Sequence, residues 1–433
     1  MARLRSRRFL THAAWVVVIL AVALTARSLW VAYAPADPSD GRHLNDTQFY
    51  YGSAVQLAEG KGYVNPWTGI GTAQWPPGYT FLLAGLFRLF GTHVEVAWGA
   101  NIVLGALTCV ALYTVGCLIA GQRVGALAGL LLAVLPGHVF FSSVVLSEIP
   151  FTLLTVVVMA LILLVPRAKG DWMVLRLAVV GALIGVAALV RGQGLVLLPT
   201  AALFWWLSTA DLLRALKWTA VIVITCLAVI APWTIRNYKT MGSFVFISTN
   251  EGGNLYMGNH EGASGGFQLL AAAWIVDEYA YLPPKKQEVR ASNRALHEGL
   301  EFMFSHPDKE LQLAVSKLRY LYQDDEESLL WIDAPEAGKP LESRPVWADI
   351  TNDFYFTVLA LSAGGVAYWL RRPRSAVALP LIMVLLFTAG QLLFFTVTRF
   401  HYPMLPSFCL LAAVGVVKGV EGVRSWAEAR RVA

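Results

Sequence analysis

The sequence has little charge. Asp, Glu, Lys and Arg together make up 14% of its 433 residues, whereas a soluble domain carries about 25%. This shortage excludes an ordinary soluble globular protein. Hydrophobic residues instead make up 57% of the chain, and such a composition indicates an integral membrane protein.

Cysteine is also scarce. All four cysteines lie inside apolar runs, and no two of them form a Cys-x-x-Cys pair: Cys109, Cys117, Cys226 and Cys409. These positions exclude a zinc knuckle and a disulfide framework. We interpret the four as small residues of the protein core.

Apolar runs approaching the length of about 20 residues that a membrane span needs recur along the chain. They predict about ten transmembrane helices, at residues 10–33, 96–120, 123–141, 149–166, 173–190, 193–209, 217–235, 353–370, 376–397 and 401–420. The window at 193–209 is the weakest, because it is short and contains Pro199. The N-terminal run follows a basic start but has no evident small-residue cleavage site, so we interpret it as a retained helix.

The basic residues fix the expected orientation. The net charge of +6 comes from Lys and Arg clustered at the ends of the apolar runs, as the positive-inside rule describes, and does not indicate a nucleic-acid partner. Residues 3–8, 167–176, 214–217, 371–374 and 418–431 all carry such clusters and all fall on one side. We therefore expect both chain ends in the cytoplasm.

Three parts follow from this topology. We expect residues 1–235 to form an N-terminal transmembrane module, whose first outer loop is 35–92. Residues 236–350 form a large, mixed extracytoplasmic loop region, and residues 351–433 form C-terminal transmembrane helices and a cytoplasmic tail. Inside the first loop, 78–91 is apolar but too short to span, which predicts a helix lying in the membrane interface.

A few charged residues break the topology pattern, because they lie at the outward ends of spans, where charge is costly. They are Asp46, Glu148, Arg191, Arg236 and Arg399, the last followed by His401 and Tyr402. Arginine binds phosphate through its fork of donors, and a carboxylate acts as a general base. Structural alternatives stay open: membrane anchoring for each arginine, helix N-terminal charge for Glu148, and capping for Asp46.

Aromatic and amide residues accompany these charges. Trp75 and Tyr79 in the first loop are candidates for stacking on a sugar, although such residues also gather at membrane interfaces without any ligand. Asn254 and Tyr256 in the large loop are candidate substrate contacts, and the alternative is a plain turn. Tyr402 near Arg399 is a further candidate substrate contact.

The order of several motifs resembles the GT-C superfamily of glycosyltransferases, in particular its family 39-like members, which are related to protein O-mannosyltransferases and aminoarabinose transferases. The motifs are "QLAEGKGYVNP", "WPPGYTFLLAGLFRLFG", "VVLSEIPFTLL", "APWTIRNY", "STNEGGNLYMGNH" and "TRFHYPMLPSFCLLAA". The resemblance implies an all-α GT-C bundle, a polyprenyl-phosphate-linked sugar donor and an extracytoplasmic active site. It also implies that the module 1–235 is catalytic and that the protein lies in a bacterial plasma (inner) membrane. Asp46 is then the catalytic base, Glu148 the acid of the second loop, and Arg191, Arg399 and His401 lie near the donor phosphate.

The expected function is therefore sugar transfer from a polyprenyl phosphate to the hydroxyl of a lipid, glycan or protein acceptor, with inversion. Many relatives carry two adjacent acids where this chain has Asn45 and Asp46, so a metal held by paired carboxylates is not predicted. No cofactor is expected to be required; a divalent cation is optional, with His43 one conceivable ligand. The alternative function is a polyprenyl-lipid or polysaccharide transporter without transferase chemistry, although the chain has no internal repeat.

Overall fold

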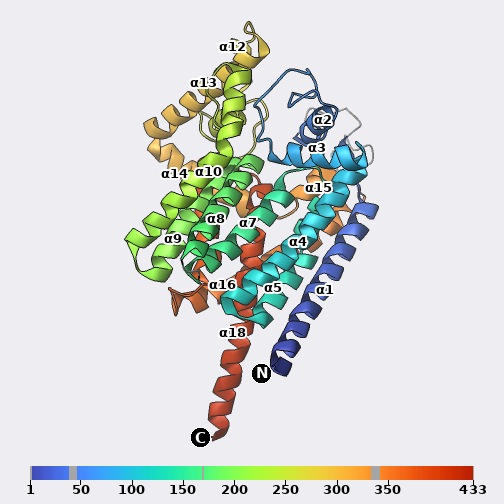
Figure 1. Cartoon of the computed structure of the whole chain (residues 1–433). Coiled ribbons are helices and arrows are strands. Elements are labelled where there is room, and N and C mark those ends of the chain that lie inside the picture. Colours follow the sequence, from blue (N-terminus) through green and yellow to red (C-terminus); the bar gives the residue numbers. More distant parts are fainter. Residues whose placement is uncertain (1, 39–45, 168–169, 333–341, 433) are drawn as a thin grey trace.

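The computed structural model describes residues 2–38, 46–167, 170–332 and 342–432, so the candidate ligand His43 lies outside the described residues. Across those ranges the chain is helical, with no strand beyond one isolated bridge between Val64 and Gly71. The expected all-α class is confirmed. Figure 1 shows long, roughly aligned helices with a group of shorter helices over one end.

Six helices in the described part are long and apolar enough to cross a membrane. They are α1 (Ala2–Tyr33), α4 (Val94–Ala120), α7 (Glu148–Leu164), α8 (Asp171–Val190), α10 (Leu212–Met241) and α18 (Leu405–Val432). A bent pair raises the number to seven. The chain is thus a multi-pass membrane protein, but the expected count of ten spans is not confirmed.

Helices also occupy the three remaining windows, without meeting the same criterion for a span. They are α9 (Leu197–Thr209), α16 (Arg344–Leu370) and α17 (Ala378–Gln391). The first and last have only 13 and 14 residues, because α9 begins after the 3₁₀ turn η4 (Gly192–Val196) and α17 ends before an irregular segment. The first half of α16 is polar and contains Asp349 and Asp353.

The bent pair consists of α5 (Gln122–Val134) and α6 (Pro136–Phe140), which continues into η2 (Phe141–Ser143). The two axes differ in direction by 60°. Leu135 between them is extended, as expected for a residue before a proline, whose ring disfavours the helical conformation there. The break leaves the last carbonyls of α5 without partners in their own helix.

A fully buried arginine of α1 binds those carbonyls. Arg27 donates hydrogen bonds to the carbonyl oxygens of Ala133 (3.2 Å) and Leu132 (3.5 Å), and to Nδ1 of His138 in α6 (2.6 Å). Gly105 of α4 makes room for it, since a Cβ there would lie 2.6 Å from Nε of Arg27. The arginine therefore acts as a cap for the broken helix.

Small residues let the helices approach closely, as is common in membrane bundles. Gly181 of α8 packs directly on the backbone of α10, and Gly365 of α16 packs on the backbone of α18 at Leu411. The four cysteines are free, and Cys109, Cys226 and Cys409 are buried among the packed helices, as expected.

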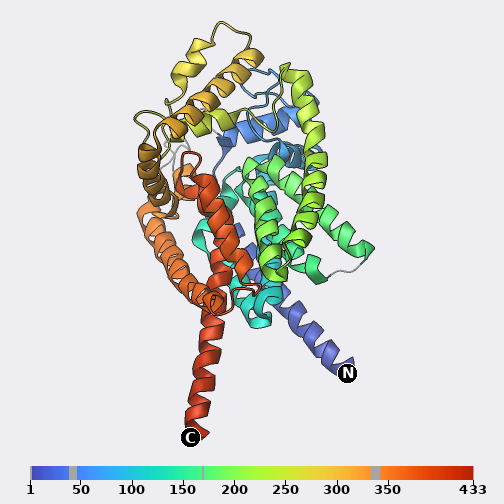
Figure 2. The ribbon, with the colours of Figure 1, turned by 90° about the vertical axis from the view of Figure 1, so that its left-hand side faces the viewer.

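The shorter helices gather at one end of the bundle, which we call the loop side. They are α2 (Asp46–Ala58), α3 (Gly78–Phe90), α11 (Asn250–Gly258), α12 (Ala273–Glu278), α13 (Pro284–Ser305), α14 (Pro307–Tyr322) and α15 (Glu327–Ile332). The helix α3 lies where the sequence predicted one. Figures 1 and 2 show that both chain ends lie at the opposite end of the bundle.

Candidate active site

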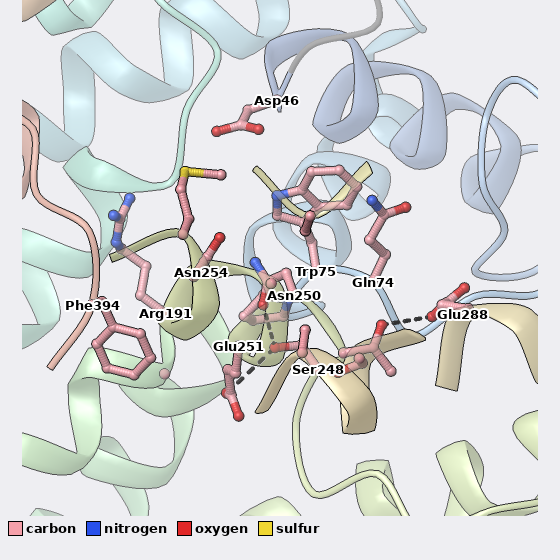
Figure 3. A pocket seen from close by; sticks show the side chains of 18 of the residues that line it. Asp46, Gln74, Trp75, Arg191, Ser248, Asn250, Glu251, Asn254, Glu288 and Phe394 are labelled. Carbon is pink, nitrogen blue, oxygen red and sulfur yellow. Dashed lines mark hydrogen bonds between the residues drawn. The ribbon is translucent and has the colours of Figure 1, made fainter. Parts of the chain in front are cut away.

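A cavity of about 950 Å³ lies on the loop side. Its walls come from segments far apart in the sequence: the first loop, the turn at 190–196, helices α11 and α13, and the segment from α17 into the 3₁₀ turn η6 (Thr398–Met404). Figure 3 shows polar side chains from several of these segments pointing into one space.

Two predicted residues from opposite ends of the chain meet in this cavity. Asp46 is the first residue of α2, where the helix dipole favours an acid, and Arg399 comes from η6. Nη2 of Arg399 donates to Oδ2 of Asp46 over 2.9 Å. The guanidinium of Arg399 also lies over the ring of Trp331, 4.9 Å from its centroid. Both charged side chains line the cavity, so the cation and the carboxylate are available to one ligand.

A second ion pair lies beside the first. Nη1 of Arg191 is 2.5 Å from Oε1 of Glu148 and donates to Oγ of Ser147 over 3.1 Å. Glu148 opens α7 with a side chain 1% exposed and is not among the cavity-lining residues, whereas Arg191 lines the cavity. Glu148 therefore acts on the cavity through Arg191, which it holds in place.

The structure places two other predicted cations away from the cavity lining. Arg236 donates to the backbone carbonyls of Thr72 (2.6 Å) and Tyr63 (2.7 Å) and lies over the ring of Trp233. Its donors thus hold the first loop against α10.

His401, a residue of η6, is fully buried. Its Nδ1 donates to the carbonyl of Leu321 (2.7 Å), and its Nε2 lies 3.0 Å from Oδ1 of Asp325. Burial raises the pKa of Asp325, which lies in the turn between α14 and α15. These contacts fix η6, and with it Arg399, from the side away from the cavity.

Of the aromatic and amide residues predicted to contact the substrate, some line the cavity and others lie away from it. Trp75 and Asn254 line the cavity. Tyr79 is buried and donates to Asn101, Tyr402 is buried and stacks on His138, and Tyr256 accepts a hydrogen bond from the indole of Trp274. These three tyrosines contribute to packing rather than to the cavity wall.

Sequence reasoning missed three acidic residues around the cavity. Glu288 of α13 accepts from Thr72 Oγ1, from the backbone N–H of Ala73 and from Thr249 Oγ1, so it joins three walls. Glu327 of α15 faces Arg399, and burial raises its pKa. Glu251 of α11 lines the cavity within the quoted motif "STNEGGN". Glu251 and Glu327 lie in helices of only nine and six residues, too short for a periodic pattern to indicate which side chains face inward. Glu288 lies near the start of the 22-residue helix α13, and its partners come from other segments of the chain.

The amino-acid sequence matches one family, described as dolichyl-phosphate-mannose-protein mannosyltransferase, over residues 74–235, which is less than half of the chain. The matched part contains Glu148 and Arg191 but neither Asp46 nor Arg399. No curated protein matches the sequence.

Solved structures share the fold over nearly the whole chain. The archaeal oligosaccharyltransferase AglB from Archaeoglobus fulgidus, in complex with an inhibitory peptide and a dolichol-phosphate, matches with a TM-score of 0.59 and 16% identity, over 98% of this chain and 52% of its own. The oligosaccharyltransferase of the same organism tethered to an acceptor peptide matches with a TM-score of 0.59 and 15% identity, over 95% of this chain and 50% of its own. This chain therefore spans about half the length of these proteins.

ArnT from Cupriavidus metallidurans bound to undecaprenyl phosphate is a weaker match, with a TM-score of 0.44 and 18% identity over 93% of this chain and 78% of its own. The resemblance expected from the sequence motifs is thus supported by a family match over the central spans and by the archaeal structures over the whole bundle. The chain has the fold of a GT-C superfamily glycosyltransferase.

Proposed function

We propose that the protein transfers a sugar from a polyprenyl-phosphate-linked donor to the hydroxyl of an acceptor, with Asp46 as general base. One observation carries this proposal: Asp46, Arg399 and Arg191 line a single cavity at the end of a membrane bundle. A phosphate on a membrane lipid has its charge at this level, and two guanidinium groups match its oxygens.

The reaction needs little beyond these groups. An oxygen of the acceptor attacks the anomeric carbon, and the bond from that carbon to the phosphate oxygen breaks with inversion. Asp46 takes the proton of the attacking hydroxyl, and the polyprenyl phosphate leaves with the bonding electron pair. Arg399 and Arg191 stabilise the charge on the departing phosphate electrostatically. Because a phosphate is a good leaving group, no general acid is required.

The polyprenyl chain needs an apolar path to this phosphate site. Val190, Leu195 and Val196 at the turn between α8 and α9, together with Phe387 and Leu393 near the end of α17, form an apolar wall of the same cavity. The contact of α17 with α9 and η4 brings the two sides of that wall together. We propose that the prenyl chain lies along it.

The acceptor is a lipid, a glycan or a protein that reaches the loop side. We propose that this side is extracytoplasmic in a bacterial plasma membrane, because the basic clusters lie toward the opposite end. Two arginines provide the positive charge that a metal would otherwise bring to the phosphate. Transfer is therefore expected to continue in EDTA, with a divalent cation optional.

The test uses purified full-length protein in lipid nanodiscs. It is mixed with undecaprenyl phosphate carrying labelled glucose, galactose, mannose or arabinose, and with envelope lipids, glycans and proteins as acceptors. Wild type should move label from at least one donor, and Arg399→Gln should lower that transfer by at least tenfold. Arg214→Gln, an exposed arginine at the far end of the bundle, is the matched control. Transfer that is equal in the two variants would refute the proposed site; no transfer from any donor would favour the transporter alternative.

A further inference from the structure

The cavity contains a carboxylate that the transfer chemistry does not use. Glu251 of α11 lines the cavity and is half-buried. Ser248 is the hydrogen-bond donor that the described residues offer to it, over a long 3.4 Å. The same hydroxyl lies 2.8 Å from Oδ1 of Asn250, and a hydroxyl has one proton to donate. The shorter contact takes that proton, so the carboxylate of Glu251 is left short of donors.

The surroundings of Glu251 increase the free-energy cost of a carboxylate that lacks hydrogen-bond donors. Burial raises the pKa of Glu251, and no nearby cation of the described chain offsets that effect. A buried polar group normally has a partner in the working state of a protein, because leaving it unpaired costs free energy. A ligand with several hydroxyl donors would provide such partners.

The position of Glu251 relative to the proposed phosphate site indicates which part of a ligand would lie beside it. A Cβ on Gly192 would lie 3.1 Å from Oε1 of Glu251, so this carboxylate rests against the residue next to Arg191. In a polyprenyl-phosphate sugar, one glycosidic oxygen joins the ring to the phosphate. A phosphate bound at Arg191 thus holds its sugar near this turn.

The neighbouring side chains suit a sugar. Asn250, Asn254 and Gln74 offer both donors and acceptors, and Trp75 offers an aromatic face. Figure 3 shows these groups around the same space as Glu251, with Arg191 on one side and Asp46 farther along.

We infer that Glu251, with Asn250 and Asn254, forms the subsite that recognises the hydroxyl groups of the donor sugar and so determines which sugar is transferred. This inference rests on the proposed function. Glu251 accepts hydrogen bonds from ring hydroxyls of the sugar, whereas Arg399 and Arg191 bind the phosphate that all donors share.

The test compares lipids with and without a sugar. Full-length protein in nanodiscs is titrated with bare undecaprenyl phosphate and with undecaprenyl phosphate carrying glucose, galactose, mannose or arabinose. Wild type should bind at least one sugar lipid more tightly than the bare lipid. Glu251→Gln should reduce that preference by about 10- to 100-fold, the effect of losing hydrogen bonds to a charged group, and leave the bare lipid unaffected. Arg399→Gln should weaken the binding of both the bare lipid and the sugar lipids.

Controls separate the possible failures. Glu301→Gln removes an exposed acid from α13 and should change neither affinity. Glu251→Gln keeps the size of the side chain, and a melting temperature equal to wild type shows that it folds. The inference would be overturned if Glu251→Gln lost the same affinity for the bare lipid as for the sugar lipids, or if it kept the preference of wild type for a sugar lipid. It would also be overturned if wild type showed no such preference. In each of these cases phosphate binding would still stand. A wild type that binds none of these lipids would overturn the proposed function as well.

Discussion

Replacing Asp46 with asparagine separates the two consequences of its ion pair with Arg399. Asparagine keeps an oxygen that accepts the hydrogen bond from Nη2 of Arg399, now 2.9 Å from Asp46, but it lacks the charge and cannot take a proton. The fold should therefore persist while the chemistry fails. At the same time Arg399 loses the anion that competes with the donor phosphate.

The substitution should lower turnover and raise donor affinity, and these two effects differ in size. Loss of a general base lowers turnover by about 10²- to 10⁴-fold. For the ion pair, Coulomb's law with an effective dielectric constant of about 20 gives roughly 6 kcal/mol at 2.9 Å. The side chains of Arg399 and Asp46 are 13% and 27% exposed, so water screens part of this. A net attraction of ~1–2 kcal/mol between Asp46 and Arg399 remains. Because the substitution removes this competition for Arg399, donor binding should tighten by about 5- to 30-fold.

The assay measures turnover and donor affinity separately, by transfer of labelled sugar and by titration with undecaprenyl phosphate. Glu59→Gln is the matched control, since Glu59 follows the same helix α2 but pairs with Lys61 at the surface. Asp46→Asn should lower turnover and tighten binding, whereas the control should do neither. Unchanged turnover would disprove the base role, and weaker donor binding would show that Asp46 supports the site instead of competing for Arg399.

Three further predictions concern stability, measured by thermal unfolding in detergent. Glu148→Gln should destabilise the protein by about 3–5 kcal/mol because it leaves Arg191 buried without its charge partner, and the double variant with Arg191→Gln should lose less than the two single losses combined. Burial raises the pKa of Glu251 above 4.5, so the folded state holds its proton longer than the unfolded state; stability falls as pH rises from about 4.5 through the folded pKa, and Glu251→Gln should remove that part of the fall. Gly252→Ala would collide with a backbone carbonyl of α13 and should lower the melting temperature, whereas Gly253→Ala, which has open space beside it, should not; equal melting temperatures would refute this close packing.

The sequence predicted the parts of the site that lie at helix ends. Asp46, Arg191 and Arg399 were found because charge stands out against apolar runs, and the weave of the spans brings such ends to one side. The same argument selected Arg236 and His401, which lie near the same level but bind backbone carbonyls and a buried acid. The position of a residue along the bundle was predictable, whereas the direction of a side chain around its helix was not.

Other features depended on contacts that no pattern indicates. The inward orientation of Glu251 follows from how α11 packs on α13, and the position of Glu288 depends on partners in the first loop. The count of ten spans is not confirmed, because α9 and α17 have only 13 and 14 residues, and hydropathy windows cannot tell that a helix ends early.

Arg27 of α1 affects how freely the helix broken at Leu135 can bend. A helix broken at Leu135 would ordinarily be a place where a bundle bends, yet Arg27 binds the carbonyls on one side of the break and His138 on the other. Opening the break would take from this buried guanidinium its partners on α5 and α6 and leave it the carbonyl of Ala23 in its own helix, which is costly. Since His138 stacks on Tyr402, three residues from Arg399, the cap on the broken helix also contacts the turn η6 that carries Arg399, and a movement at the break would be felt at the cavity wall.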